Sequence, residues 1–308
     1  MTLQQLEYVM AVYRCKHFAR AADYCDVTQP TLSSMIQKLE DELGIRIFDR
    51  RHKPIEPTKS GMAVIEEARK VLRNARRLKE RVAEEQQSLS GTFNIGILPT
   101  VAPYLLPRFF PQLMNRHPDL DLRVTEMKTE DIKLALRRGD LDTGIISRVE
   151  NLDETEIHTL FYEQFFAYVS KNDALFDISS IKTSDLTGEY LWLLEEGHCF
   201  STQLIKFCDL KEANRSKRSY NLGSIETFMR IVESGKGVTF IPELATLQLN
   251  DNQRQLLKPF ALPIPTREII MITSPDFVRT ALRDRLIDII RESVPQHMLT
   301  LNRTQQRV

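Results

Sequence analysis

The chain has 308 residues, of which 42 are basic and 42 acidic, so its formal net charge is zero. Its length predicts about two domains, and its 42% of hydrophobic residues can bury a core, which excludes intrinsic disorder. The balanced charge excludes a histone-like protein, and four cysteines in so long a chain exclude a disulfide scaffold.

The charge changes sign near residue 90. Residues 1–90 hold 16 basic and 13 acidic residues, a net charge of +3, and the remainder holds 26 and 29, a net charge of −3. The segment 86–91 is rich in Gln and Ser and ends in Gly91, which is typical of a helix end at a domain boundary. Because we find no long apolar run and no secretory signal, we expect a cytoplasmic protein without membrane contact.

Before this boundary we expect helices and one hairpin. Apolar residues repeat with a helical period over about 3–13, 18–25 and 28–43; Pro30 suits the first turn of the third helix and Gly44 its end. The alternating residues 45–55 predict a short β-hairpin. Thr58 begins a helix of about 30 residues, and a long exposed helix of this kind usually needs a partner.

After the boundary, predicted strands alternate with predicted helices, which indicates an α/β sheet. The expected strands are 93–98, 120–126, 142–147, 165–170, 191–194, 238–241 and 269–273. The expected helices are 101–116, 131–138, 201–210, 225–234 and 279–291.

The second and third helices predict a helix-turn-helix. Ala21 and Ala22 allow close packing, and a set of apolar residues would bury one face of the pair: Val27, Leu32, Ile36 and Leu39. The other face and the hairpin carry hydroxyl, amide and basic groups that can contact bases and phosphates. These candidate DNA-binding residues are Gln29, Pro30, Thr31, Ser33, Ser34, Lys38, Arg50, Arg51 and Lys53. On composition alone, an ordinary helical hairpin with a polar outer face is an equally good interpretation.

The order of residues favours the first interpretation. The block Ala21-Ala22, Val27, Gln29-Pro30, Ser33, Leu39-Glu40, Leu43-Gly44 and Phe48-x-Arg50 resembles the LysR-type transcriptional regulators. The resemblance implies an all-α winged helix-turn-helix over 1–58, a linker and dimerisation helix over 59–90, and an α/β effector domain over 91–308. The effector domain would resemble periplasmic binding proteins, with one subdomain over 91–162 and 267–308 and the other over 163–266.

The effector half contains two cysteines, Cys199 and Cys208, whose spacing fits neither a redox pair two residues apart nor a zinc knuckle. Only one histidine, His198, is adjacent, so we expect no metal site. A helix between the cysteines would separate them by about 13 Å, whereas a disulfide needs Cα atoms within about 7 Å. The pair could therefore bridge only if the helix unwinds; otherwise both cysteines are structural.

The surrounding residues closely resemble the sensor segment of the peroxide-responsive members of this family. The similarity covers Gly197-His198-Cys199, Gln203 and Phe207-Cys208, with further matches at 95–107, 224–227 and 235–239. It implies that peroxide oxidises Cys199 to a sulfenic acid and that Cys208 resolves it to a disulfide. The implied peroxide pocket comprises Thr100, Thr129, His198 and Gln203, with Arg267 as its cation. Thr129 has an alternative role as a helix N-cap.

The resemblance implies a peroxide-sensing, DNA-binding transcription regulator rather than an enzyme, without a cofactor or metal. Its expected partners are promoter DNA, hydrogen peroxide, further copies of itself in a homodimer or homotetramer, RNA polymerase and a thiol reductant. A conformational switch is expected at Ser224, Ile225, Glu226 and Thr227. Two alternatives remain: a LysR-type regulator that binds a small organic effector in the cleft between the subdomains, and a thiol peroxidase.

Overall fold

The computed structural model describes the chain except for residues 52, 86–88, 153–154, 187–190, 195–198 and 209–223. The chain forms two compact units, Met1–Gln86 and Gln87–Val308, which are described separately. The N-terminal unit contains α1 (Leu3–Cys15), α2 (Phe18–Tyr24), α3 (Gln29–Leu43), β1 (Phe48–Asp49), β2 (Glu56–Pro57) and α4 (Lys59–Glu85).

The helices of the N-terminal unit confirm the predicted helix-turn-helix. The Thr28 side chain caps α3, Pro30 lies in its first turn, and Gly44 ends it with a φ of 68°. The residues predicted to face inward form the core with at most 1% exposure, apart from a half-buried Val27: Ala21, Ala22, Leu32, Ile36 and Leu39. Local capping signals and the apolar period therefore determine this unit.

The hairpin of this unit extends further than predicted. Its strands pair Phe48 with Pro57 and Asp49 with Glu56, so the second strand lies beyond residue 55. Ile55 is unavailable for pairing because its N–H donates to the Lys16 carbonyl at 3.1 Å. Where the hairpin meets α4, a Cβ on Gly61 would lie 1.9 Å from the Ile47 carbonyl oxygen, so only glycine fits there.

The C-terminal unit is an α/β structure, as predicted. Its strands are β3 (Gly91–Ile97), β4 (Leu120–Glu126), β5 (Thr143–Ser147), β6 (Glu156–Val169), β7 (Leu191–Trp192), β8 (Val238–Pro242), β9 (Leu257–Pro259), β10 (Ile264–Thr273) and β11 (Gln305–Arg307). Its α-helices are α5 (Ala102–Arg116), α6 (Thr129–Arg138), α7 (Cys199–Phe207), α8 (Ile225–Ser234), α9 (Glu243–Thr246), α10 (Asp251–Arg254) and α11 (Thr280–Ser293). Short 3-10 turns lie at Ala174–Asp177, Thr183–Asp185 and Gln296–Leu299.

Several element boundaries differ from the prediction. Strand β6 begins at Glu156, whereas its start was predicted at 165. The prediction missed the first part because these residues show no regular polar alternation and owe their burial to pairing with β10. Helix α7 begins at Cys199 and ends at Phe207 instead of covering 201–210. Its hydrogen bonding closes where the Cys208 N–H meets the Leu204 carbonyl at 2.9 Å, and residue 210 lies outside the described residues.

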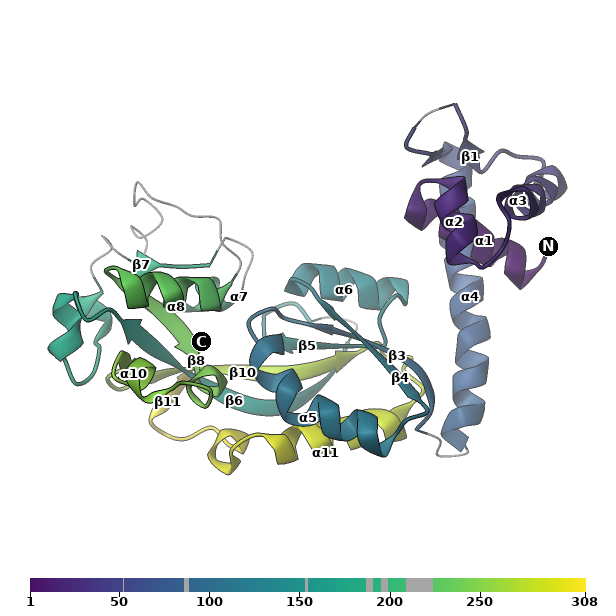
Figure 1. Cartoon of the computed structure of the whole chain (residues 1–308). Coiled ribbons are helices and arrows are strands. Elements are labelled where there is room, and N and C mark those ends of the chain that lie inside the picture. Colours follow the sequence, from purple (N-terminus) through teal and green to yellow (C-terminus); the bar gives the residue numbers. More distant parts are fainter. Residues whose placement is uncertain (52, 86–88, 153–154, 187–190, 195–198, 209–223) are drawn as a thin grey trace. The chain divides into compact units, whose positions relative to one another are not determined.

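Two long strands connect the parts of the sheet, whose order is β4-β3-β5-β10-β6-β8-β7. The first part of β6 pairs antiparallel with β10, while residues 165–169 pair with β8 and β9. In Figure 1, α6 covers one face of the β3–β5 region, and α5 and α11 cover the other. Helix α6 approaches closely because Gly96 and Gly144 are neighbours there, and a Cβ on either would lie within 2.5 Å of a core side chain.

Candidate functional site

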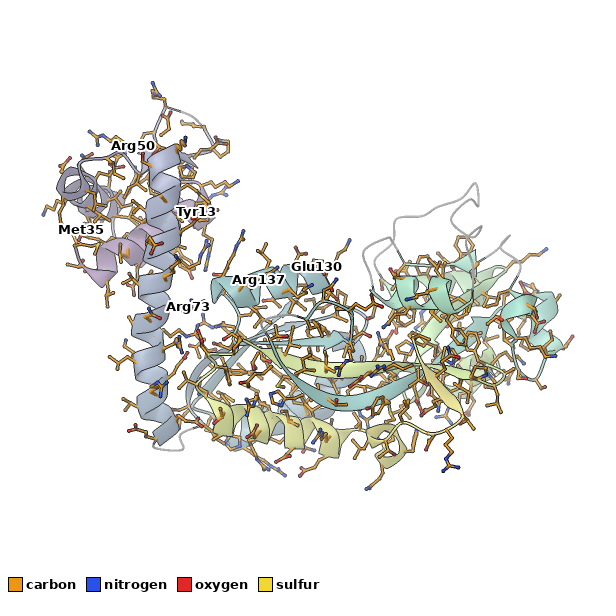
Figure 2. All side chains as sticks on the ribbon, turned by 180° about the vertical axis from the view of Figure 1, so that it is seen from behind. Tyr13, Met35, Arg50, Arg73, Glu130 and Arg137 are labelled. Atoms are coloured by element: carbon orange, nitrogen blue, oxygen red, sulfur yellow. The ribbon has the colours of Figure 1, made fainter. Side chains whose placement is uncertain are left out.

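The candidate DNA-binding residues form an exposed polar surface on the N-terminal unit. On α3 and in its first turn, Ser33 is half-buried and the others are exposed: Gln29, Pro30, Thr31, Ser34 and Lys38. Arg50, Arg51 and Lys53 are exposed around the hairpin, where Figure 2 shows Arg50. The Arg50 guanidinium joins the two groups, because it donates to the Ser33 hydroxyl at 3.3 Å. This surface combines hydroxyl, amide and cationic donors suited to bases and phosphates.

A buried carboxylate fixes the hairpin against α3. Glu40 is 1% exposed, and its Oε1 accepts the backbone N–H groups of Ile47 at 2.7 Å and Phe48 at 3.3 Å. Its Oε2 accepts from Arg46 at 3.1 Å and from Arg50 at 3.2 Å. No role was predicted for Glu40 beyond its place in the family block, although a charged residue beside the apolar face of α3 was a signal. Glu40 therefore positions Arg50 of this surface together with the neighbouring Arg46.

In the C-terminal unit, the structure brings Thr100 and Arg267 together. Arg267 is fully buried, and its Nη1 donates to the Thr100 hydroxyl at 3.0 Å while its Nη2 donates to the Thr100 carbonyl at 2.9 Å. The counterion is Glu163, which the sequence analysis missed. Its Oε2 accepts from Arg267 Nε at 2.9 Å and lies 2.7 Å from Nη2.

Backbone pairing aligns this buried ion pair. Arg267 on β10 and Glu163 on β6 are directly opposite each other in the antiparallel ladder. The other oxygen of Glu163 accepts the Leu244 N–H at 2.9 Å. Burial raises the pKa of the Glu163 carboxyl, and the Arg267 guanidinium and the Leu244 amide oppose this effect. The hydrogen bonds satisfy the carboxylate, which is the condition for keeping such a pair in a dry interior.

Two aromatic rings cover the Arg267 guanidinium. Its Cζ lies 5.7 Å from the ring centre of Phe165 and 5.1 Å from that of Phe200. The two rings meet edge-on with their centres 4.9 Å apart. Phe200 belongs to α7 and directly follows Cys199, so the first turn of α7 lies against the buried arginine. The side chain of Cys199 and the whole of His198 lie outside the described residues.

Cys208 follows the last residue of α7 and is a free thiol, 6% exposed. Burial raises the pKa of the Cys208 thiol to about 12. A thiol with such a pKa is a weak nucleophile at neutral pH, because the thiolate is the reactive form. Since a helix of nine residues separates the cysteines, their Cα atoms are about 13 Å apart, too far for a disulfide.

Gln203 binds groups outside the Arg267 pair, and Thr129 begins a helix. Gln203 accepts from the Ser147 hydroxyl at 3.1 Å and donates to the Val308 carbonyl at 3.0 Å. Thr129 is the first residue of α6 and is buried; the N-cap is Lys128, so the alternative role of Thr129 as an N-cap is wrong. Among the described residues, hydrogen bonds thus join Thr100 to Arg267 but do not link Gln203 to that pair.

The four residues expected to form a conformational switch begin α8. Ser224 is the N-cap, Ile225 is buried and Thr227 is exposed. Glu226 accepts a hydrogen bond from the Tyr104 hydroxyl of α5 at 3.0 Å. Burial and the Glu226 carboxylate raise the pKa of Tyr104 above its ordinary range. The segment is therefore tied to the helix that follows Thr100.

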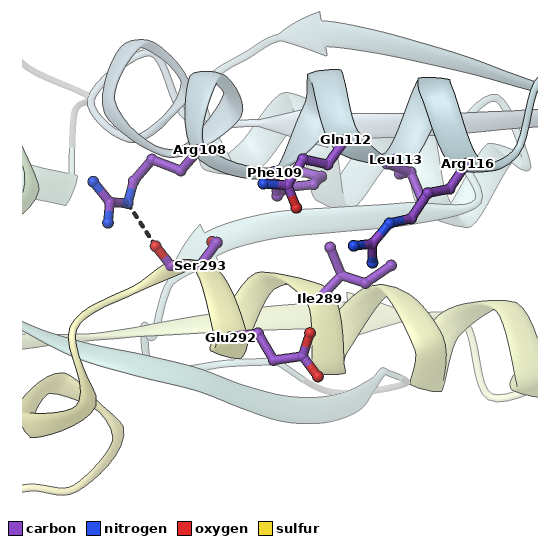
Figure 3. Close-up of a pocket in the computed structure, with 8 residues that line it drawn as sticks. All are labelled: Arg108, Phe109, Gln112, Leu113, Arg116, Ile289, Glu292 and Ser293. Atoms are coloured by element: carbon purple, nitrogen blue, oxygen red, sulfur yellow. Dashed lines mark hydrogen bonds between the residues drawn. The ribbon is translucent and has the colours of Figure 1, made fainter.

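A small cavity lies elsewhere, between α5 and α11 (Figure 3). Its volume is about 100 Å³, and Arg108 at its edge donates from Nε to the Ser293 carbonyl at 2.6 Å. It shares no residue with the Arg267 site. Within the described residues, no group of three or more His, Cys, Asp or Glu could hold a metal ion. None of the described helices has the length and apolar character required to cross a bilayer.

Comparisons with protein families define the class of the chain. Residues 3–62 match the family described as bacterial regulatory helix-turn-helix protein, lysR family, and residues 86–295 match the LysR substrate binding domain. The chain therefore belongs to the LysR family of bacterial regulators.

Among its relatives are proteins named for hydrogen peroxide. The chain is 34% identical to the hydrogen peroxide-inducible genes activator of Dickeya chrysanthemi over 98% of this chain and 99% of that protein. It is 33% identical to the DNA-binding transcriptional dual regulator OxyR of Escherichia coli K12, over 96% and 97%. A full-length OxyR variant of Pseudomonas aeruginosa matches 94% of this chain and 98% of its own, with a TM-score of 0.74 and 32% identity. The OxyR crystal structure from Porphyromonas gingivalis matches 71% of this chain and 99% of its own, with a TM-score of 0.67 and 41% identity.

Proposed function

We propose that this protein is a hydrogen peroxide-sensing transcription regulator, switched by a reversible disulfide between Cys199 and Cys208. One observation carries the proposal: the buried cation Arg267 is hydrogen-bonded to Thr100 and stacked on Phe200, the residue after Cys199. The relatives named above, which are similar over nearly the whole chain, support the same function.

The buried arginine leaves donors for a peroxide oxygen. A guanidinium has five N–H groups, and bonds to Glu163 and Thr100 use four of them. The fifth, on Nη1, has no acceptor among the described residues, and Thr100 Oγ1 already accepts from Nη1, so its own proton is free to donate. These two donors lie side by side. We assign them to the oxygen that departs as hydroxide, since such donors stabilise the charge that develops in the transition state.

The chemistry requires two steps. The Cys199 thiolate attacks one peroxide oxygen, the O–O bond breaks, and the other oxygen leaves as hydroxide, which takes up a proton to form water. Cys199 is then a sulfenic acid. Cys208 attacks its sulfur, a second water departs, and the disulfide forms. We assign Thr100, Thr129, His198, Gln203 and Arg267 to the peroxide pocket.

The burial of Cys208 gives these steps an order. Its raised pKa keeps it protonated and unreactive in the closed helix, so peroxide meets Cys199 first. Opening of the first turn of α7 after the first step would uncover Cys208 in its place and carry Cys199 toward it. We place the resulting rearrangement at Ser224–Thr227, where the bond between Tyr104 and Glu226 joins α8 to α5.

The output of the sensor is a change in DNA binding. We assign residues 1–58 to promoter recognition through the α3 and hairpin surface, 59–90 to dimerisation, and 91–308 to sensing. Helix α4 exposes apolar residues that suit pairing with a second copy: Val71, Leu78 and Val82. Within the sensing part, the subdomains 91–162 with 267–308, and 163–266, would meet where β6 and β10 change partners. A homotetramer at cytoplasmic promoters, RNA polymerase contact and reset by a thiol reductant complete the proposal.

The proposal is tested by mapping the oxidised thiols. The reduced protein is exposed to equimolar hydrogen peroxide, free thiols are alkylated, and bridged peptides are identified by mass spectrometry. We expect a link between Cys199 and Cys208 and a changed promoter footprint. A footprint that is the same before and after oxidation, or peptides that show no such link, would contradict the proposed function. Many turnovers with a reductant and no effect on DNA binding would instead indicate a thiol peroxidase.

A further inference from the structure

An aromatic side chain, Phe200, anchors the first turn of α7. Phe200 is 3% exposed, meets Phe165 edge-on at 4.9 Å, and covers the Arg267 guanidinium at 5.1 Å. Phe165 and Arg267 lie on the central strands β6 and β10, and Glu163 fixes Arg267 there. Phe200 is therefore the part of α7 that covers an ion pair anchored in the sheet.

A disulfide between Cys199 and Cys208 requires one end of α7 to leave its place, because helical geometry holds the cysteines about 13 Å apart. Moving the Cys208 end would draw Leu204 and Cys208, which are 0% and 6% exposed, out of the core. The first turn is the end that opens at lower cost, because among its described residues only Phe200 is buried. Its opening withdraws Phe200 together with Cys199.

We propose that Phe200 sets the thiol–disulfide equilibrium of this protein, an inference that rests on the proposed disulfide switch. Its ring stabilises the dithiol form by packing on Phe165 and Arg267, and disulfide formation gives up this packing. The balanced reaction is protein dithiol plus glutathione disulfide giving protein disulfide plus two molecules of glutathione. Glutathione disulfide accepts the two electrons and the two thiol protons. Loss of the ring destabilises the protein dithiol and leaves the protein disulfide unaffected, so the disulfide becomes easier to form and harder to reduce.

The test is a redox titration of the full chain. Wild type and Phe200→Leu are equilibrated in glutathione buffers of graded ratio, quenched in acid and alkylated, and the bridged fraction is measured on peptides. We expect Phe200→Leu to raise the equilibrium constant for the disulfide about tenfold, since an edge-on ring pair and a cation–π contact are lost. For this two-electron couple, tenfold lowers the midpoint potential by about 30 mV.

The matched control is Phe207→Leu on the same helix. Phe207 is half-buried and meets Phe260 with ring centres 6.3 Å apart, away from Arg267, so its loss should leave the midpoint unchanged. If Phe200→Leu does not fold, Phe165→Leu removes the partner ring and should shift the midpoint in the same direction. An unshifted midpoint in the folded variant, or an equal shift in Phe207→Leu, would overturn the proposal. Absence of the disulfide from wild type at every ratio would instead refute the switch itself.

Discussion

Removal of Glu163 should unbalance a fully buried charge of the C-terminal unit. Arg267 is 0% exposed and Glu163 1%, and Glu163 accepts three hydrogen bonds, from Nε and Nη2 of Arg267 and from the Leu244 N–H. Glu163→Ala leaves the guanidinium without a counterion in a medium that solvates it poorly. Breaking one partner of a buried pair costs about 3–5 kcal/mol. We therefore expect Glu163→Ala to lower the free energy of unfolding of the C-terminal unit by about 3–5 kcal/mol.

The assay is urea unfolding of the full chain under reducing conditions, followed by far-UV circular dichroism and by Trp192 fluorescence, which reports on the C-terminal unit alone. The control is the double variant Glu163→Leu with Arg267→Met, which replaces both charges by apolar groups of similar size. Such replacements are often neutral or stabilising, so the double variant should be more stable than Glu163→Ala. If Glu163→Ala costs less than about 1 kcal/mol, or if the double variant is the less stable one, the assignment of Glu163 as an obligatory counterion is refuted.

Three further outcomes are expected. Thr100→Val should slow oxidation of Cys199 by peroxide about 100-fold, because it removes a hydroxyl donor. Thr92→Val, on the strand that precedes Thr100, should not slow it. Equal rates for wild type and Thr100→Val in rapid-quench alkylation would exclude Thr100 from the pocket. Glu40→Gln should weaken promoter binding in anisotropy titrations, because Arg46 and Arg50 lose the carboxylate that holds them. The control Glu42→Gln, at an exposed position of the same helix, should have no effect. Unchanged promoter affinity of Glu40→Gln would contradict the positioning role of Glu40. Since burial raises the pKa of Cys208 from 9.0 to about 12, the folded state holds this proton more tightly than the unfolded state. Its contribution to stability is therefore complete below about pH 9 and falls by about 1.4 kcal/mol per pH unit above it, and identical unfolding curves of wild type and Cys208→Ser from pH 9 to 10.5 would disprove this.

The sequence predicted the helices of the N-terminal unit well because their signals are local. Thr28, Pro30 and Gly44 are capping and first-turn residues whose effect depends on a few neighbours. The candidate DNA-binding surface follows from the same helical period, since residues opposite Leu32 and Ile36 have to face outward. The role of Glu40 was not predicted, because its partners are backbone N–H groups of a hairpin whose exact path the sequence does not define.

The proposed sensing site was harder to predict because its contacts are distant in sequence. Glu163 and Arg267 are 104 positions apart and meet only through the register of β6 and β10. The first part of β6, which contains Glu163, lacks the polar alternation that identifies a strand, so the counterion could not be assigned. The hydrogen bond from Ser147 to Gln203 could not be predicted either, because these residues are also far apart in the sequence. Resemblance named Thr100 and Arg267, but only the folded chain shows that they touch.

The pairing of Arg267 with Glu163 across two central strands has a consequence for recovery. The half of the proposed pocket that carries charge is built on the sheet, whereas the half that carries sulfur is built on a short helix. Opening of α7 would leave the arginine, its counterion and Thr100 in place. Reduction then has to refold only one helix onto a template that persists through the cycle, so a reduced molecule regains its sensitivity without rebuilding its cation site.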